Sequence, residues 1–172
     1  FTALLVPLCL PLSSHAQDYS FSLDQEVVDI CINQGGSVTL EYWFTFTCDR
    51  DAHAIDVVDI NLPTDDYGLS DTRADVGGQQ VSFIEESRYV THGIAVWLGS
   101  AEIGPGKTGT VHLVVDRVGR MVYEDSEDDE YASIQFSPTQ FESRVVHGST
   151  DLTARFHLPP GVRPEESRRH HS

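Results

Sequence analysis

Carboxylates are the side chains best able to do chemistry in this sequence, and six of them lie within seven consecutive residues. This acidic run consists of Glu124, Asp125, Ser126, Glu127, Asp128, Asp129 and Glu130. Carboxylate oxygens are the ligands that calcium prefers, so the six acids are the candidate metal ligands of the chain. EF-hand spacing is absent, because the sixth position from Asp125 is Glu130 instead of glycine and the twelfth is Phe136. The alternative interpretation is a solvated loop whose charges repel one another.

Two tryptophans are candidates for a binding surface. Trp43 lies between Tyr42 and Phe44, and Trp97 lies between Val96 and Leu98. Because successive side chains of a strand point to opposite faces, each tryptophan is expected on the face away from its apolar neighbours. Such exposed aromatic rings can bind a ligand or a partner. The alternative is that both faces of the sheet are partly covered in a sandwich, or that a tryptophan caps the edge of a sheet.

No motif typical of catalysis or of nucleotide binding has its required context. The sequence contains neither GxSxG nor HExxH, and its histidines do not have metal-ligand spacing. Residues 101–108 (AEIGPGKT) match a relaxed phosphate-loop pattern, but they continue into TGTVHLVV, which is typical of a strand. A phosphate loop leads instead into a helix whose N-terminal amides hold the phosphates. We therefore expect no enzyme activity and no nucleotide as a ligand.

The charge balance excludes further classes of partner. The chain has 172 residues with 11 Lys and Arg against 27 Asp and Glu, a formal net charge of -16. A nucleic-acid-binding protein needs a basic surface for the phosphates, and this sequence has none. The same excess of acid argues against an anionic membrane surface as partner.

The first residues predict export. Residues 1–12 (FTALLVPLCLPL) are uncharged, and Ser14-His15-Ala16 fits the small-x-small rule for signal-peptide cleavage. The apolar stretch is too short to span a bilayer. We therefore expect residues 1–16 to be a signal peptide and the chain to be extracytoplasmic, either secreted or at the cell surface.

The strands expected on either side of positions 33–36 keep Cys31 and Cys48 apart. Residues 25–32 and 37–47 are strand-like, and the sequence NQGG between them is typical of a turn. An antiparallel hairpin closed there pairs residues whose numbers sum to about 69 or 70. Cys31 then faces position 38 or 39 and Cys48 faces position 21 or 22, about 30 Å apart at roughly 3.3 Å per residue. A disulfide spans much less, so we expect two free, buried thiols.

Short strands separated by turns account for most of residues 17–160. The alternation is clearest where Val38, Leu40, Tyr42, Phe44 and Phe46 share one face. Other strands are expected at 19–23, 25–32, 55–62, 72–76, 80–84, 89–98, 108–118, 132–136 and 152–158. The only helical turn expected lies at 139–145. This pattern predicts an all-β fold, an antiparallel β-sandwich of immunoglobulin-like architecture without the Cys-Trp-Cys signature.

The chain is thus expected to divide into three parts. A signal peptide occupies residues 1–16, the β-sandwich domain occupies 17–160, and a polar linker or tail occupies 161–172. Prolines and charges in PPGVRPEESRRHHS are typical of a linker, so we expect more protein, such as a membrane anchor, downstream in the full gene.

Three segments carry a resemblance to a known group of proteins. They are SVTLEYWFTF at 37–46, NLP at 61–63 and GSTDLTARFHLPPGV at 148–162. With these segments, residues 18–162 resemble the N-terminal extracytoplasmic β domains of uncharacterised bacterial predicted membrane proteins. The resemblance implies an amphipathic β domain after a signal peptide and implies no catalytic residues.

The sequence therefore favours a non-catalytic β-sandwich domain, a binding or structural module of a larger exported or membrane-anchored bacterial protein. Its partner at the cell surface would be a protein or a glycan. One alternative is a calcium-stabilised adhesion or carbohydrate-binding module, and another is an accessory domain of a secreted hydrolase.

Overall fold

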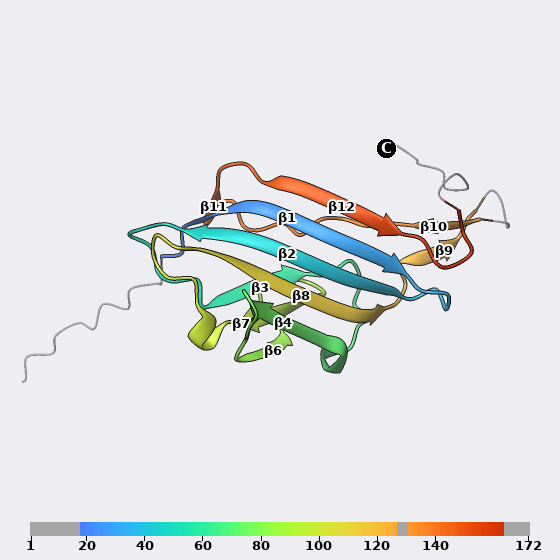
Figure 1. Ribbon diagram of the computed structural model, residues 1–172, viewed down its shortest axis with the longest axis horizontal. Helices are drawn as coiled ribbons and strands as arrows, with labels where there is room; N and C mark the ends of the chain where they lie inside the picture. Colours follow the sequence, from blue (N-terminus) through green and yellow to red (C-terminus); the bar gives the residue numbers. More distant parts are fainter. Residues whose placement is uncertain (1–17, 127–130, 164–172) are drawn as a thin grey trace, which may run out of the picture.

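Two long antiparallel strands, β1 (Phe21–Ile32) and β2 (Val38–Cys48), form the centre of the fold. They belong to a computed structural model that describes residues 18–126 and 131–163 (Figure 1). The turn between them contains Gly36 at a φ of +80°, which residues with a Cβ rarely adopt. The predicted register is confirmed, because Cys31 faces Thr39 and Cys48 faces Phe21. Both thiols are free; that of Cys48 is buried and that of Cys31 is half-buried.

A large sheet extends on both sides of this pair. On the β2 side follow β8 (Thr108–Val118), β4 (Thr72–Val76) and β5 (Gln79–Gln80), each antiparallel to its neighbour. On the other side, β11 (Val146–His147) and β12 (Asp151–His157) both run parallel to β1. The large sheet is therefore mixed, whereas the sequence predicted antiparallel strands only. The difference arises because β11 and β12 reach β1 through a long connection and not through a hairpin.

A small sheet forms the second layer. It has the order β3 (Val57–Asn61), β7 (Gly93–Trp97) and β6 (Phe83–Glu86), all antiparallel. The strand predicted at 80–84 is in fact divided between the two sheets, since Gln80 ends β5 and Phe83 begins β6.

Only short elements remain among residues 18–126 and 131–163. They are the hairpin of β9 (Val122–Glu124) and β10 (Ala132–Ile134) and the 3-10 turns η1 (Leu69–Asp71) and η2 (Gly99–Ala101). Over residues 18–126 and 131–163, no helix has the length and apolar character needed to cross a membrane.

The core lies between the two sheets, as the all-β sandwich prediction requires (Figure 1). The alternating apolar face of β2 is fully buried, with Tyr42, Phe44 and Phe46 each 0% exposed. The small sheet contributes Ile60 and Val96 from its own inner face.

The strand predicted to follow the phosphate-loop-like residues 101–108 is confirmed. At this position β8 begins, whereas a true phosphate loop would lead into a helix.

The small sheet does not cover the whole inner face of the large sheet, and residues 136–145 cover the remainder. In this covering segment, the ring of Phe141 packs edge-on against those of Phe44 and Phe46, at centroid distances of 6.0 and 5.5 Å. Its backbone is anchored on Glu26, which is 2% exposed and accepts a hydrogen bond of 3.1 Å from the Thr139 N–H. Burial raises the pKa of Glu26, and this hydrogen bond offsets only part of the effect.

The helical turn predicted at 139–145 is present only at the end of that range. There, the backbone N–H groups of Val145 and Val146 both donate to the Glu142 carbonyl, at 3.0 and 3.1 Å. The rest of the covering segment has no regular secondary structure, and its residues Thr139 and Gln140 bond to Glu26 of the large sheet and to Asn61 of the small sheet.

A pair of tyrosine substitutions tests the account of the core. The buried hydroxyl of Tyr42 has no hydrogen-bond partner among the described residues, whereas that of Tyr67 donates to the Gly93 carbonyl at 3.0 Å. We expect Tyr42→Phe to raise the free energy of unfolding by about 1 kcal/mol and Tyr67→Phe to lower it by about the same amount. Urea unfolding of the two variants and the wild type measures both changes in the free energy of unfolding. A loss of stability in Tyr42→Phe would mean that its hydroxyl has a partner.

Candidate functional site

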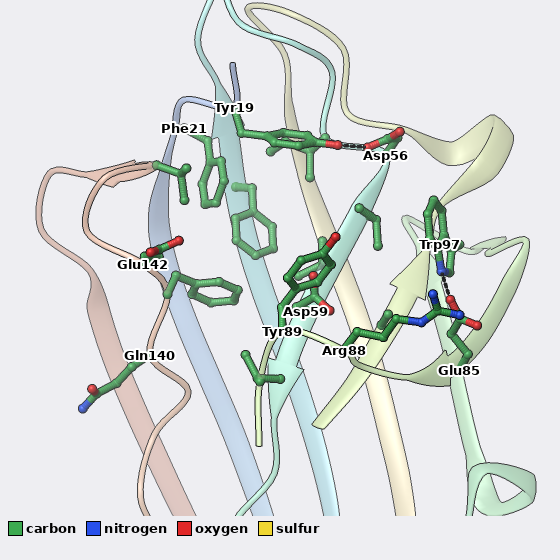
Figure 2. Close-up of a pocket in the computed structure, with 18 of the residues that line it drawn as sticks. Tyr19, Phe21, Asp56, Asp59, Glu85, Arg88, Tyr89, Trp97, Gln140 and Glu142 are labelled. Carbon is green, nitrogen blue, oxygen red and sulfur yellow. Dashed lines mark hydrogen bonds between the residues drawn. The ribbon is translucent and has the colours of Figure 1, made fainter. Parts of the chain in front are cut away.

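A cleft of about 1100 Å³ lies along the β3 edge of the small sheet. One wall is the outer face of the small sheet, with Asp59 and Trp97, and the other is the covering segment, with Gln140 and Phe141. Figure 2 shows Tyr89 between these two walls. The cleft thus lies where the two parts that cover the large sheet meet.

Strand register places the cleft's aromatic and acidic side chains in rows. On the small sheet, Trp97 of β7 lies between Val57 and Phe83, and the next row on the same face joins Asp59, Ala95 and Glu85. The indole ring stacks on the ring of Phe83 at 5.5 Å, with an interplanar angle of 16°. Its Nε1–H donates to Glu85 Oε1 at 3.0 Å, a bond that fixes the ring at the wall of the cleft (Figure 2).

Hydrogen bonds from neutral donors hold two other carboxylates of the cleft. The Tyr19 hydroxyl donates to Asp56 Oδ1 at 2.6 Å, and the Ser87 hydroxyl donates to Asp59 Oδ1 at 2.5 Å. Burial, followed by the hydrogen bond to Asp56 and its charge, raises the pKa of Tyr19 far above its usual value. The Tyr19 hydroxyl therefore stays protonated and remains a donor at physiological pH.

The loop between β6 and β7 projects Tyr89 over the cleft. The Ser87 hydroxyl accepts hydrogen bonds from the backbone N–H groups of Tyr89 and Val90, at 3.0 and 3.2 Å. This arrangement holds the start of the loop while the Tyr89 side chain stays 88% exposed. A large aromatic ring that remains in water above a cleft is available to a ligand.

The cleft has an excess of negative charge. Its lining includes five acids against two arginines, Arg88 and Arg144, with the acids at Asp56, Asp59, Glu85, Glu86 and Glu142. Arg144 forms an ion pair of 2.8 Å with Glu142. Chemically, the cleft offers acceptor oxygens beside aromatic rings, an arrangement suited to hydroxyl groups, apolar ring faces and cations.

Trp43 is on a different surface from Trp97, so the structure does not bring the two tryptophans together. It lies on the outer face of the large sheet, where its ring stacks on that of His112 of β8 at 5.1 Å. His112 Nε2 is 2.8 Å from Glu41 Oε1, and His112 Nδ1 is 2.9 Å from Asp75 Oδ2. This group links three neighbouring strands, β2, β8 and β4.

The electrostatics of this group favour a protonated His112. Burial alone would lower the pKa of His112, but the hydrogen bonds to Asp75 and Glu41, together with their charges, outweigh it and raise the pKa above its usual value. For Asp75, burial acts in the opposite direction to the hydrogen bonds from His112 and from the Gly78 N–H, and the result is a lowered pKa. The two carboxylates thus stabilise the imidazolium form of His112.

The acidic run lies only partly within the described residues. Glu124 ends β9, and Asp125 accepts a hydrogen bond of 2.8 Å from the Ser133 hydroxyl. Glu127, Asp128, Asp129 and Glu130 lie outside the described residues. Among residues 18–126 and 131–163, no group of three or more His, Cys, Asp or Glu side chains is arranged to hold a metal ion. Calcium binding by the run therefore stays a prediction.

Sequence reasoning found Trp97 but not the residues that surround it. Alternation along β7 places Trp97 and Ala95 on one face. The neighbours Phe83, Tyr89 and Phe141 come from β6, a loop and the covering segment, and no local pattern relates these segments to β7. The only available signal was the alternation that places Asp59 on the polar face of β3.

Comparison with known proteins gives little further information. No family model and no curated protein matches the chain. An M1 zinc metallopeptidase from Deinococcus radiodurans is 13% identical, with a TM-score of 0.42, over 62% of this chain and 22% of the peptidase. A mutant M1 zinc metallopeptidase from that organism, bound to a Tyr-Ser-Ala substrate, is 17% identical, with a TM-score of 0.38. The match covers 59% of this chain and 21% of the mutant peptidase. This chain spans about a fifth of the length of these peptidases, and a likeness this weak supports no functional conclusion.

The His112 group predicts a pH-dependent contribution to stability. A histidine whose pKa is raised on folding stabilises the fold fully below its unfolded pKa of about 6.5, and this contribution is lost as pH rises through the folded pKa. We expect His112→Gln to lower the free energy of unfolding by about 1 kcal/mol at pH 6. The deficit should shrink between pH 6 and pH 9, because the wild type loses its imidazolium as pH rises through the raised pKa of His112. Urea unfolding at both pH values measures it, and a deficit that does not change with pH would contradict the assignment.

Proposed function

We propose that this chain contains a non-catalytic, extracytoplasmic binding domain of a larger exported or membrane-anchored protein, and that the cleft beside Trp97 binds its ligand. The observation that carries the proposal is the convergence of Trp97, Tyr89 and Phe141 with carboxylates in a cleft of about 1100 Å³. Clefts of this size that combine aromatic walls with a few fixed polar groups are typical ligand-binding sites.

The lining favours a glycan as the ligand. Sugar hydroxyls can donate to the carboxylates of Asp56 and Glu85, and the apolar face of a sugar ring can pack on Trp97 or Tyr89. The excess of acids repels anions, so the preferred glycan is neutral or carries amino groups. A sulfated or uronic-acid glycan would bring like charges together in a partly desolvated site, at a cost in affinity.

The N-terminal sequence supports the location. Residues 1–12 have no charge, and Ser14-His15-Ala16 fits a cleavage site, so the domain would act outside the cytoplasm, where glycans of the cell surface are available.

Glycan binding by paired tryptophan variants tests this function. We expect the chain to bind neutral or amino glycans on an array and Trp97→Ala to weaken that binding about tenfold, equivalent to 1.4 kcal/mol. Trp43→Ala is the matched control, since Trp43 is also a half-buried strand tryptophan but lies outside the cleft. Calorimetry on the best array ligand measures the dissociation constants.

Three outcomes would overturn the proposal. They are the absence of binding to any glycan, binding to sulfated glycans alone, and equal losses in Trp97→Ala and Trp43→Ala.

A further inference from the structure

The β12 strand is an open edge of the large sheet. It pairs with β1 along one side through seven consecutive residues, from Gln25–Asp151 to Cys31–His157. No other strand of the described residues pairs with it, and Figure 1 shows it at the margin of the sheet. All seven of its residues are exposed.

This edge lacks most of the features that normally prevent strands from pairing with another molecule. Proteins protect sheet edges with very short strands, charged side chains (lysine above all), prolines, bulges or covering segments. The opposite edge of the large sheet follows this rule, because β5 has two residues. β12 has seven residues in unbroken register and contains neither lysine nor proline. The charged side chains of β12 are Asp151 and Arg155, which have opposite signs. The unprotected edge therefore fits a strand of another chain.

The inner face of β12 is apolar and only partly covered. Leu152 and Phe156 are 47% and 48% exposed, although they adjoin Glu26 and Ile30 of β1, which are 2% and 0% exposed. The ring of Phe136 packs against one side of the Phe156 ring, with the two ring centroids 6.5 Å apart. Apolar side chains next to the core are therefore exposed to solvent at this edge, and a further strand beside β12 would bury more of Leu152 and Phe156.

We infer that β12 pairs in antiparallel fashion with β12 of a second copy, which forms a two-fold symmetric dimer with one continuous large sheet. The sequence of β12, DLTARFH, is complementary to itself when the two-fold axis passes through Ala154. Leu152 then faces Phe156 of the second copy on the inner face, and Asp151 faces His157 on the outer face. An apolar pair and a pair in which an imidazole can hydrogen-bond a carboxylate are both combinations that can stabilise neighbouring strands.

Other registers fit less well. An axis through Arg155 would place two arginines opposite each other, and an axis through Thr153 would pair only residues 151–155 of the strand. The register centred on Ala154 uses all seven residues and places two small side chains at the axis. Symmetric contacts of this kind, with the same surface on both subunits, are the commonest form of homodimer.

The charge distribution also permits a second copy here. The chain as a whole has a net charge of -16, which opposes association. On β12, Asp151 is balanced by Arg155, and both Arg155 and His157 lie within ion-pair distance of Asp29, at 2.8 and 3.3 Å. The edge is thus close to neutral in an otherwise acidic molecule.

Cross-linking by introduced cysteines tests the dimer and its register. The experiment uses the whole chain with Cys9→Ser and Cys31→Ser, which leaves only the buried Cys48. Residues opposite each other in antiparallel strands have Cα atoms about 4.5–5.5 Å apart, within the reach of a disulfide. We expect Ala154→Cys to form a disulfide-linked dimer with diamide about tenfold faster than Leu152→Cys, whose two copies would be about 14 Å apart. Both positions are exposed, so the variants are matched.

Sedimentation velocity over a concentration series gives an independent readout. We expect the unmodified chain to form dimers and Ala154→Lys to shift it to monomers, because two lysines would face each other at the axis. Gln79→Lys, at the opposite edge of the large sheet, is the control and should leave the dimer intact. A wild type that sediments as a monomer throughout, equal cross-linking at positions 152 and 154, or a dimer that persists in Ala154→Lys would overturn the inference.

Discussion

The burial of one row of aromatic side chains is the constraint on which the rest of this structure depends. Tyr42, Phe44 and Phe46 follow one another along the inner face of β2, and all three are fully buried. The strands of the small sheet have at most five residues, too few to cover an eleven-residue strand and its twelve-residue neighbour. Residues 136–145 therefore supply the rest of the cover, and the hydrogen bond from Thr139 to the buried Glu26 fixes their position.

The candidate site is a consequence of this divided cover. Because the small sheet and the covering segment are separate pieces, a cleft remains where they meet, beside β3. The outer face of the small sheet supplies rigid positions for Trp97 and Glu85, whereas the loop after β6 supplies the exposed Tyr89. A binding site with fixed walls and one exposed loop combines preorganised groups with access for a ligand.

The carboxylates of the cleft and those on the outer face of the large sheet have different hydrogen-bond partners. In the cleft, Asp56 and Asp59 accept hydrogen bonds from the hydroxyls of Tyr19 and Ser87, which are neutral donors. On the outer face of the large sheet, the carboxylates of Glu41 and Asp75 are instead used within the protein, since both bond to His112. The acidic side chains thus divide between the candidate cleft and a structural group around His112, a division that composition alone does not reveal.

The sequence by itself determined the longer strands and the local pairing of β1 with β2, but it did not reveal the short strands β9 and β11. Alternation along β2 identified the buried face, and the NQGG turn determined the register that keeps Cys31 and Cys48 apart, because both signals depend on neighbours in the chain. Only the tertiary structure decided which distant segments meet. The parallel addition of β12 to β1, the division of residues 80–84 between two sheets and the approach of Phe141 to the β2 aromatics depend on long connections. Their ends are placed by packing between layers, which leaves no periodic pattern in the sequence.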